Sequence, residues 1–437
     1  MENAAKFTFE IYQYFCLVAL ALYLPRFSYY FAIFKKQKRI VNSNKNKIAV
    51  IVPARNESKV IKHCLDSLTA QTYDPQYFDV HIVVADENDP TIEIAAAYER
   101  SFVTVESRQT CKGEALDGVL KKILSETPDK YDAFLFIDAD NIAAPDLLEE
   151  MNNALGSGKE IICSKKLAKN FQSCHRHSRS FISNCTALLW TQIDELGNRA
   201  RNFLNMSITM IGTGMIVCAK IIKENNGWPY RSLTEDYEMT ADAIVKGWTS
   251  MFYSHAIVYT EEATDIKTAS KRKIRWFKGY TQCQHLYFKK IVKMVLSRKI
   301  KFRNLEFFCS TYPAYAFFAV SAAVMIFGLT AFVFSLSNST VNSSETLHLA
   351  LIPLLYIYGS LFTLTLISLI VDWRNMKIPL YEKLAVLIFN PIYLFDFARI
   401  IIAALITSYD YYKWENTDRI PFEKKAIRGN DHGTTKK

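Results

Sequence analysis

The sequence predicts an α/β fold, a doubly wound mixed sheet in the cytoplasm, with α-helical transmembrane and interfacial segments attached to it. Two observations lead to this fold class. Between residues 48 and 163, short apolar runs alternate with stretches of helical periodicity, the pattern of a sheet with helices on both faces. Long apolar segments occupy both ends of the 437-residue chain, so a mean hydropathy of only +0.01 conceals a polar middle. This length accommodates two or three structural units of about 150 residues each.

The first apolar segment, residues 11–34, carries a single charge, Arg26, and is followed at once by the basic run 35–39. About 20 apolar residues span a bilayer, and a positive flank marks the cytoplasmic side. We therefore expect residues 1–46 to hold a transmembrane helix, which is retained because no signal-peptide cleavage pattern is present. The net charge is +10, and basic clusters lie next to apolar segments, which favours a lipid bilayer over nucleic acid as the partner.

Residues 47–265 are expected to form the cytoplasmic α/β domain. The expected strands are 48–52, 80–85, 102–105, 133–137, 160–163 and 250–259. The expected helices are 59–68, 91–98, 113–123, 145–154 and 239–245. This alternation argues for a largely parallel sheet, and such sheets bind ligands at the carboxyl ends of their strands.

Polar clusters follow three of these strands, at residues 53–57, 86–88 and 138–140. Asp138 and Asp140 are two residues apart, and carboxylates at this spacing bind Mg²⁺ or Mn²⁺ together with phosphate oxygens, although aspartates at strand ends are also ordinary turn residues. Lys112 opens a helix, where free amide groups already favour phosphate. Together these features predict a nucleoside-diphosphate site.

Three later segments extend the same region. The run Gly212-Thr213-Gly214 either bends a core strand or lets the backbone approach a ligand closely. The carboxylates of Thr234-Glu235-Asp236 open a helix, where they act either as a cap or in chemistry. Residues 267–290 mix cations and aromatic residues at helical spacing, which predicts an amphipathic interfacial helix within a segment 266–308.

The C-terminal region, residues 309–410, is again apolar. Segments 311–334 and 349–371 are each long enough to span a bilayer, and the connection 335–346 lacks basic residues, which fits the outer side. Asn390-Pro391 interrupts segment 384–406, so we expect a broken or interfacial helix there and a basic cytoplasmic tail at 411–437. The nine cysteines include no CxxC pair, and neither a disulfide framework nor a zinc site is expected.

In order and spacing, these motifs resemble those of the family 2 membrane glycosyltransferases, which include the cellulose, chitin, curdlan and hyaluronan synthases. The resemblance covers roughly residues 47–290. It is carried by Val52-Pro53-Ala54-Arg55-Asn56-Glu57, Asp86, Lys112, Asp138-Ala139-Asp140, Gly212-Thr213-Gly214, Thr234-Glu235-Asp236 and Arg275-Trp276. It implies a GT-A-type fold and a nucleotide-sugar donor.

The resemblance also implies roles for individual residues. Pro53, Arg55, Glu57, Asp86, Lys112, Asp138 and Arg275 would bind the nucleotide sugar. Asp140 and Asp138 would hold Mg²⁺ or Mn²⁺. Asp236 would be the general base, with Glu235 supporting it. Gly212, Thr213, Gly214 and Trp276 would bind the acceptor.

A carboxylate base acting on a sugar hydroxyl, opposite a departing nucleoside diphosphate, predicts inversion at the anomeric carbon. We expect a UDP-sugar donor, with UDP-glucose favoured, and a β-linked polysaccharide, with a β-glucan favoured, exported across the plasma membrane. The family's QxxRW motif here begins with Arg272 instead of Gln, which leaves open the transfer of a single sugar to a lipid or short acceptor. A UDP-GlcNAc-using synthase of the chitin or hyaluronan type and a non-catalytic membrane subunit are further alternatives.

Overall fold

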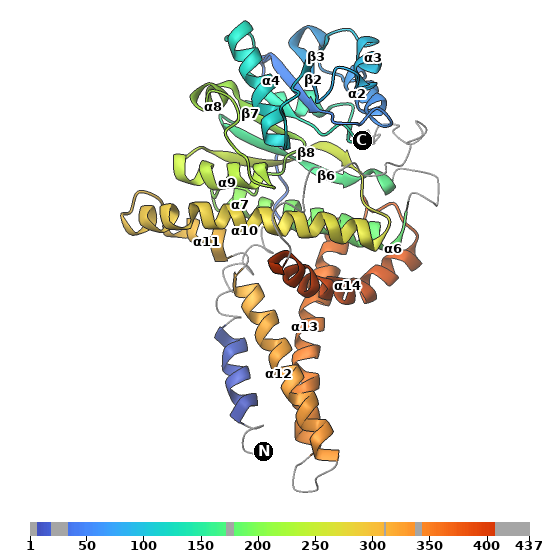
Figure 1. Cartoon of the computed structure of the whole chain (residues 1–437), viewed down its shortest axis with the longest axis vertical. Helices are drawn as coiled ribbons and strands as arrows, with labels where there is room; N and C mark the ends of the chain where they lie inside the picture. The colour runs from blue at the N-terminus through green and yellow to red at the C-terminus, as the bar shows by residue number, and fades with distance from the viewer. Residues whose placement is uncertain (1–6, 19–33, 172–178, 310–311, 337–342, 407–437) are drawn as a thin grey trace, which may run out of the picture.

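The computed structural model describes residues 7–18, 34–171, 179–309, 312–336 and 343–406. An α/β domain lies at one end of the long axis, and a stem of apolar helices extends from its lower side (Figure 1). The tail 411–437 and most of the predicted first span, residues 19–33, lie outside the described residues.

The domain is built on one eight-stranded sheet in the order β3-β2-β1-β4-β7-β6-β8-β5. Its strands are β1 (Ile48–Pro53), β2 (Phe78–Val84), β3 (Ser101–Val105), β4 (Ala133–Phe136), β5 (Ile142–Ala143), β6 (Ile161–Ala168), β7 (Met215–Cys218) and β8 (Ser250–Thr260). The half formed by β3, β2, β1 and β4 is parallel. Strand β7 is antiparallel to both of its neighbours, so the sheet is mixed, and less uniformly parallel than the alternation alone suggested.

Two hydrophobic layers cover the sheet because successive strand residues point to opposite faces. On β1, Val50 packs with Leu65 of helix α2 (Ile61–Thr69) and Leu148 of α5 (Leu147–Leu155) in one layer. Its neighbour Ile51 packs with Leu116 of α4 (Lys112–Glu126) in the other. The short helices α3 (Thr91–Ala96) and α8 (Ala219–Glu224) and the longer α9 (Glu235–Lys246) complete the domain.

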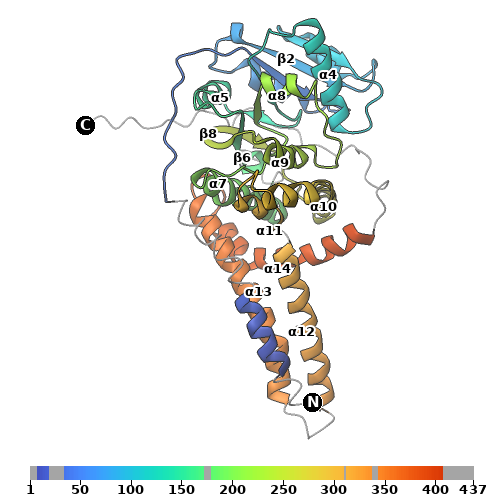
Figure 2. The same cartoon turned by 90° about the vertical axis from the view of Figure 1, so that its left-hand side faces the viewer.

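A helical layer lies between the sheet and the stem (Figure 2). It contains α6 (Phe181–Thr191), a π-helical segment at Gln192–Asn198, α7 (Arg199–Phe203), α10 (Ile266–Leu296) and α11 (Glu306–Cys309). The sequence predicted α10 but gave no sign of the π-helical segment.

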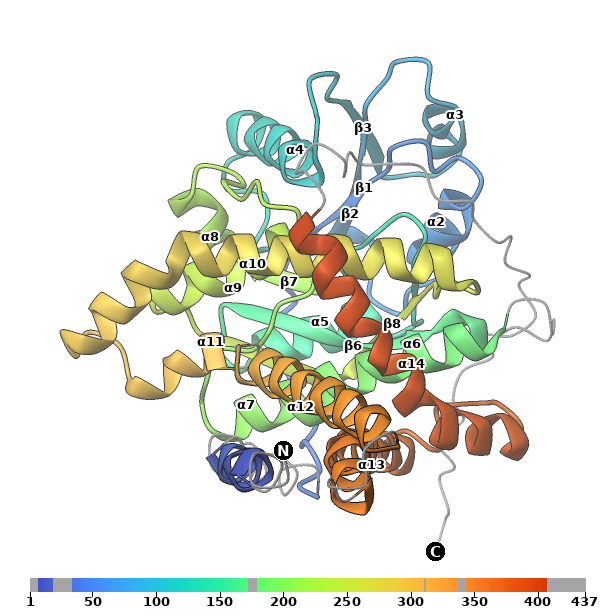
Figure 3. The ribbon, with the colours of Figure 1, turned by 60° about the horizontal axis from the view of Figure 1, so that its bottom comes forward.

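Three helices in the described chain are long and apolar enough to cross a membrane: α12 (Tyr312–Leu336), α13 (Ser343–Val371) and α14 (Leu380–Ile406). Residues 7–18 are helical and pack on the first two, with Tyr12 hydrogen-bonded to Ser321 at 2.9 Å. Helix α14 runs through Pro391 as one helix, so of the two predicted alternatives the broken helix is not observed, and the interfacial helix stays a prediction. It lies across the direction of α12 and α13 and crosses beneath α10 (Figures 2 and 3).

Buried ion pairs connect strand β6 of the sheet to the end of α13 in the stem. The Lys165 ammonium on β6 lies 2.8 Å from a carboxylate oxygen of Glu195, in the π-helical segment, and 2.7 Å from one of Asp372, which directly follows α13. The other Asp372 oxygen accepts a hydrogen bond from Thr191 at 2.8 Å. Buried charges need partners of this kind, so these contacts fix the stem relative to β6.

Candidate active site

The predicted residues meet where β4 ends and β7 begins. Lys112, at the start of α4, donates from Nζ to Asp138 Oδ1 at 2.7 Å and to the carbonyl of Gly212 at 3.0 Å. The same ammonium lies 3.4 Å from Glu235 Oε1. The backbone N–H of Gly212 donates to Asp236 Oδ2 at 2.6 Å. Four segments far apart in the sequence therefore share one cluster, which we call the Lys112 cluster.

Glycine at 212 lets the side chains of the cluster pack closely around the backbone. A Cβ there would lie 2.9 Å from Lys112 Nζ, 3.2 Å from Glu235 Oε1 and 3.3 Å from Asp236 Oδ2. Asp236 is held from two sides, because its Oδ1 accepts from the backbone N–H of Tyr237 at 2.8 Å. Its carboxylate is half-buried and sits at the first turn of α9.

The electrostatics of the cluster depend on Lys112. Burial alone would lower the pKa of its ammonium, but the carboxylates of Asp138 and Glu235 raise that pKa above its ordinary value. Burial raises the pKa of Asp138 and of Glu235, and the charge of Lys112 opposes the rise in both. The charge of the Arg275 guanidinium also lowers the pKa of Glu235, which favours its carboxylate form. The partly buried Lys112 ammonium thus limits, but does not cancel, the rise in pKa that burial causes in both carboxyl groups.

Helix α10 packs directly on the segment that carries Asp236. A Cβ at Gly279 would meet Thr234 Oγ1 at 2.4 Å and the Thr234 backbone nitrogen at 2.7 Å, so only glycine permits this approach. The backbone N–H of Leu233 donates to Gln282 Oε1 at 3.0 Å. The same helix carries Arg275 and Trp276, so α10 brings both residues to the Asp236 side of the domain.

Trp276 belongs to a group of aromatic and acidic side chains that the sequence did not reveal. Its ring lies 5.5 Å from that of Trp190 on α6, in an edge-on arrangement. Trp190 Nε1 donates to Glu262 Oε1 at 2.6 Å, and Arg272 donates to the carbonyl of Glu261 at 3.0 Å. The substituted position of the RxxRW motif therefore supports the loop that holds Glu262.

The predicted donor-binding residues of the N-terminal half lie on adjacent strand ends. Pro53 is buried at the end of β1, paired in register with Val83 of β2. Arg55 and Glu57 are half-buried in the loop that follows, and Asp86 is exposed after β2. These residues follow β1 and β2, and β1 lies next to β4, the strand that precedes Asp138.

Thr213 lies differently from what an acceptor-binding role suggests. Its side chain is 5% exposed, and Oγ1 accepts hydrogen bonds from the backbone N–H of Asp138 at 3.2 Å and from Asn141 Nδ2 at 2.5 Å. Thr213 therefore orders the Asp138 turn. Gly214 has a φ of +62°, and a Cβ there would collide with Ser164 Oγ. Glycine at this position therefore allows β6, which carries Ser164, to pack against the backbone.

The two aspartates after β4 offer hard oxygen ligands. Asp138 keeps 38% of its side chain exposed, and Asp140 is half-buried, with its backbone carbonyl accepting from Lys169 at 3.0 Å. No group of three or more His, Cys, Asp or Glu side chains in the described part of the chain is arranged to hold a metal ion. Two carboxylates fit Mg²⁺ or Mn²⁺, which take their remaining ligands from water and phosphate.

This geometry occurs in a chain with recognisable relatives. The family model described as "Glycosyltransferase like family 2" matches residues 45–279. The probable glycosyltransferase YdaM of Bacillus subtilis is 22% identical over 302 residues, which are 65% of this chain and 67% of YdaM. The probable glucomannan 4-beta-mannosyltransferase 3 of Oryza sativa subsp. japonica is 22% identical over 296 residues, 63% of this chain and 49% of the rice protein. The chain thus matches between about half and two thirds of these relatives' lengths.

A solved structure gives the same architecture. The mannosyltransferase PcManGT from Pyrobaculum calidifontis, in complex with GDP-Man and Mn²⁺, superimposes with a TM-score of 0.52 at 15% sequence identity. The match covers 86% of this chain and 98% of PcManGT. At this identity the likeness bears on the fold alone, and it confirms the GT-A-like mixed α/β fold.

Proposed function

Because the chain belongs to the glycosyltransferase-like family 2, we propose that it is a membrane-embedded, inverting, metal-dependent hexosyltransferase. It transfers a sugar from a UDP-sugar, with UDP-glucose favoured, to a growing β-linked polysaccharide, with a β-glucan favoured. The observation that carries this proposal is the Lys112 cluster. It puts a partly buried ammonium beside Asp138, and Gly212 links that ammonium to Asp236, since its carbonyl accepts from Lys112 and its N–H donates to Asp236.

The donor lies along the strand ends. Pro53, Arg55, Glu57 and Asp86 line the uridine side, at the ends of the adjacent strands β1 and β2. The diphosphate lies toward Lys112, whose raised pKa keeps it charged. An ammonium held in a partly buried site stabilises negative charge on the departing diphosphate more strongly than it would in water. Arg275 supplies a second cation from α10.

Asp236 takes the proton from the attacking sugar hydroxyl. Its carboxylate is oriented by the N–H groups of Gly212 and Tyr237, so it approaches the acceptor in one geometry. Such a base contributes on the order of 10² to 10⁴ in rate. Glu235 supports it by holding Lys112 in place, and attack opposite the diphosphate inverts the anomeric carbon.

The acceptor lies on the α10 side. Trp276 offers a ring face for a sugar, and Trp190 braces that ring from α6. Gly212, Thr213 and Gly214 form the backbone floor beneath it, with Thr213 acting through the turn it orders. Asp140 and Asp138 would hold Mg²⁺ or Mn²⁺, which would supply charge neutralisation at the diphosphate when bound.

The three long apolar helices support a reaction that takes place at a bilayer. We propose that α12 and α13 span the plasma membrane, that the α/β domain faces the cytoplasm, and that the product leaves along the stem. The buried Lys165–Asp372 pair supports this, since it holds α13 rigidly beneath β6. α10 and α14 lie at the boundary between the domain and the bilayer.

A second candidate is the transfer of one sugar to a lipid or short acceptor. Arg272 favours it, because the position where polymerising relatives carry Gln is here tied to the carbonyl of Glu261.

A donor screen with product analysis tests the proposal. Membranes containing the full chain are incubated with labelled UDP-glucose, UDP-GlcNAc and GDP-mannose, the last because PcManGT was solved with GDP-Man. A labelled product of high molecular weight that requires a divalent cation is expected from UDP-glucose. A short, organic-soluble product would support the second candidate. Absence of any transferred sugar would contradict both.

A further inference from the structure

A large cavity shares no lining residue with the Lys112 cluster. Its volume is about 1020 Å³, and it opens to the surface. It is lined by the end of α10, the segment 298–305, the C-terminal end of α9, the region after α7 and the start of β8. None of the residues assigned above to donor, acceptor or metal lines it. We call it the basic cavity.

The charge of the basic cavity is entirely positive. Five of the side chains lining it are cationic: Lys159, Arg298, Lys299, Lys301 and Arg303. Among the described residues that line it, none is Asp or Glu. Lys299 and Lys301 are exposed and make no ion pair with any other described residue. A cavity with this imbalance attracts an anion.

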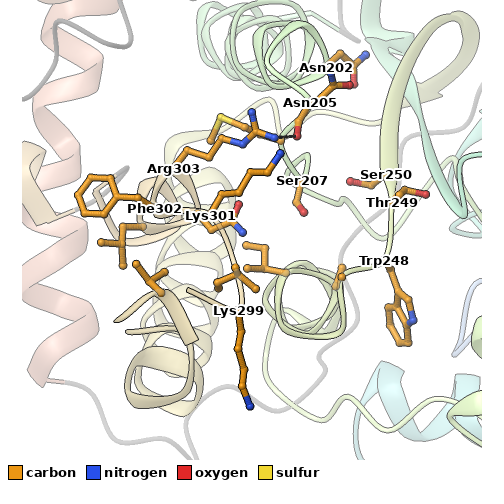
Figure 4. A pocket seen from close by; sticks show the side chains of 18 of the residues that line it. Asn202, Asn205, Ser207, Trp248, Thr249, Ser250, Lys299, Lys301, Phe302 and Arg303 are labelled. Atoms are coloured by element: carbon orange, nitrogen blue, oxygen red, sulfur yellow. Dashed lines mark hydrogen bonds between the residues drawn. The ribbon is translucent and has the colours of Figure 1, made fainter. Parts of the chain in front are cut away.

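Two of the cationic side chains, Lys301 and Arg303, lie at one point of the cavity, whereas Lys299 extends in the opposite direction (Figure 4). Figure 4 shows the Lys301 and Arg303 side chains running side by side toward Asn205 and Ser207. Arg303 is fixed there because it donates to the carbonyls of Leu204 at 2.6 Å and Asn205 at 2.8 Å. Asn202, from α7, lies near the same point in Figure 4, but its amide is bonded to the backbone of Phe252, donating to its carbonyl at 2.6 Å and accepting from its N–H at 2.9 Å. Two cations side by side next to the Ser207 hydroxyl suit phosphate oxygens.

The rim of the cavity is apolar, and two of the segments that line it are close in sequence to apolar helices. Leu296 and Phe302 expose 78% and 77% of their surface, and the Phe302 ring points away from the cations in Figure 4. Residue 303 precedes α12 by only nine positions, with α11 between them. Gln37, which belongs to the basic run after the first apolar segment, also lines the cavity. Two segments that adjoin apolar helices therefore converge on it.

We propose that the basic cavity binds the phosphate headgroup of an anionic phospholipid from the surrounding bilayer. A free phosphate would contact the cations alone. A lipid would bind the cations through its headgroup and would also contact the exposed apolar rim, on a segment that leads into α12. The inference rests on the proposed membrane placement of the stem. It is independent of which sugar is transferred.

The test measures lipid binding to the purified full chain in detergent, without donor. Phosphatidylglycerol and phosphatidylcholine are titrated separately, and bound copies are counted from the mass of the intact complex. We expect phosphatidylglycerol to bind about tenfold more tightly, and the double variant Lys299→Gln with Lys301→Gln to lose most of that preference. Both lysines are exposed, so the variant is expected to fold.

The matched control is Lys59→Gln with Lys122→Gln, which removes the same charge from exposed positions outside the cavity and should bind phosphatidylglycerol as the wild type does. Equal affinity for the two lipids, or equal losses in the two double variants, would overturn the proposal. So would displacement of phosphatidylglycerol by inorganic phosphate at equal concentration, because the cavity would then take a soluble anion. Sugar transfer is measured separately, so failure of the proposed function leaves this result interpretable.

Discussion

Replacing Gly212 by Ala is expected to reduce turnover strongly while leaving the fold intact. The new Cβ would approach Lys112 Nζ to 2.9 Å, and Glu235 Oε1 and Asp236 Oδ2 to 3.2 and 3.3 Å. All three atoms are ends of side chains, and the φ of Gly212 is not left-handed, so the free energy of unfolding should change by about 1 kcal/mol or less. Displacing the ammonium and the base by part of an ångström should lower kcat by about 10- to 100-fold, because reacting groups tolerate little misplacement.

The assay compares kcat, donor affinity and Tm of the purified full chain with those of Gly118→Ala. That control introduces a Cβ 2.4 Å from Glu106 Oε2, which also forces a carboxylate aside, but on α4 away from the cluster. Gly118→Ala should keep the wild-type kcat. A Gly212→Ala enzyme with normal Tm and normal kcat would refute the idea that close packing of Lys112 and Asp236 matters for catalysis.

Three further outcomes follow from the same contacts. Asp372→Asn should destabilise the chain by about 3 kcal/mol, because it leaves Lys165 with one carboxylate fewer in a buried site. Its Tm should be lower than that of Asp129→Asn, which breaks only an exposed ion pair. Equal Tm values for the two variants would argue against a structural role for Asp372. Burial lowers the pKa of His81 to about 4 from an ordinary 6.5, so the unfolded chain binds more protons between these values and stability should fall by about 3 kcal/mol as the pH is lowered through that window. His81→Phe should flatten that pH dependence of stability. An unaltered profile would mean that a group other than His81 causes it. Chelation of divalent cations should stop transfer and added Mn²⁺ or Mg²⁺ restore it; full activity with chelator would remove the roles proposed for Asp138 and Asp140.

Local patterns in the sequence predicted much of the α/β domain. Apolar runs such as 48–52 and 133–137 became the buried strands β1 and β4, because a short run bounded by polar residues suits a strand covered on both faces. The polar residues at their ends then lie on one edge of the sheet, and Lys112, Asp138 and Asp236 do meet. The antiparallel insertion of β7 was missed, since its four residues carry no signal for direction.

What the sequence could not predict depends on contacts between distant segments. Lys165 and Asp372 are 207 positions apart in the sequence. A lysine in a strand is expected to be exposed, and only the fold shows the carboxylate that allows it to be buried. Trp190 lies in an apolar stretch that resembles any core helix, and only the fold brings it to Trp276. The acceptor role of Thr213 rests on the motif and stays a prediction, but the motif did not indicate that its hydroxyl accepts the Asp138 N–H and so orders that turn.

The central claim is that Asp236 removes the acceptor proton. Its most direct test is the turnover of Asp236→Asn. The amide oxygen can still accept one of the two backbone N–H groups, from Gly212 or Tyr237, but the side chain no longer takes up a proton. Donor affinity should stay within about twofold of the wild type while kcat falls by roughly 10² to 10⁴. Unchanged kcat at normal donor affinity would contradict the assignment.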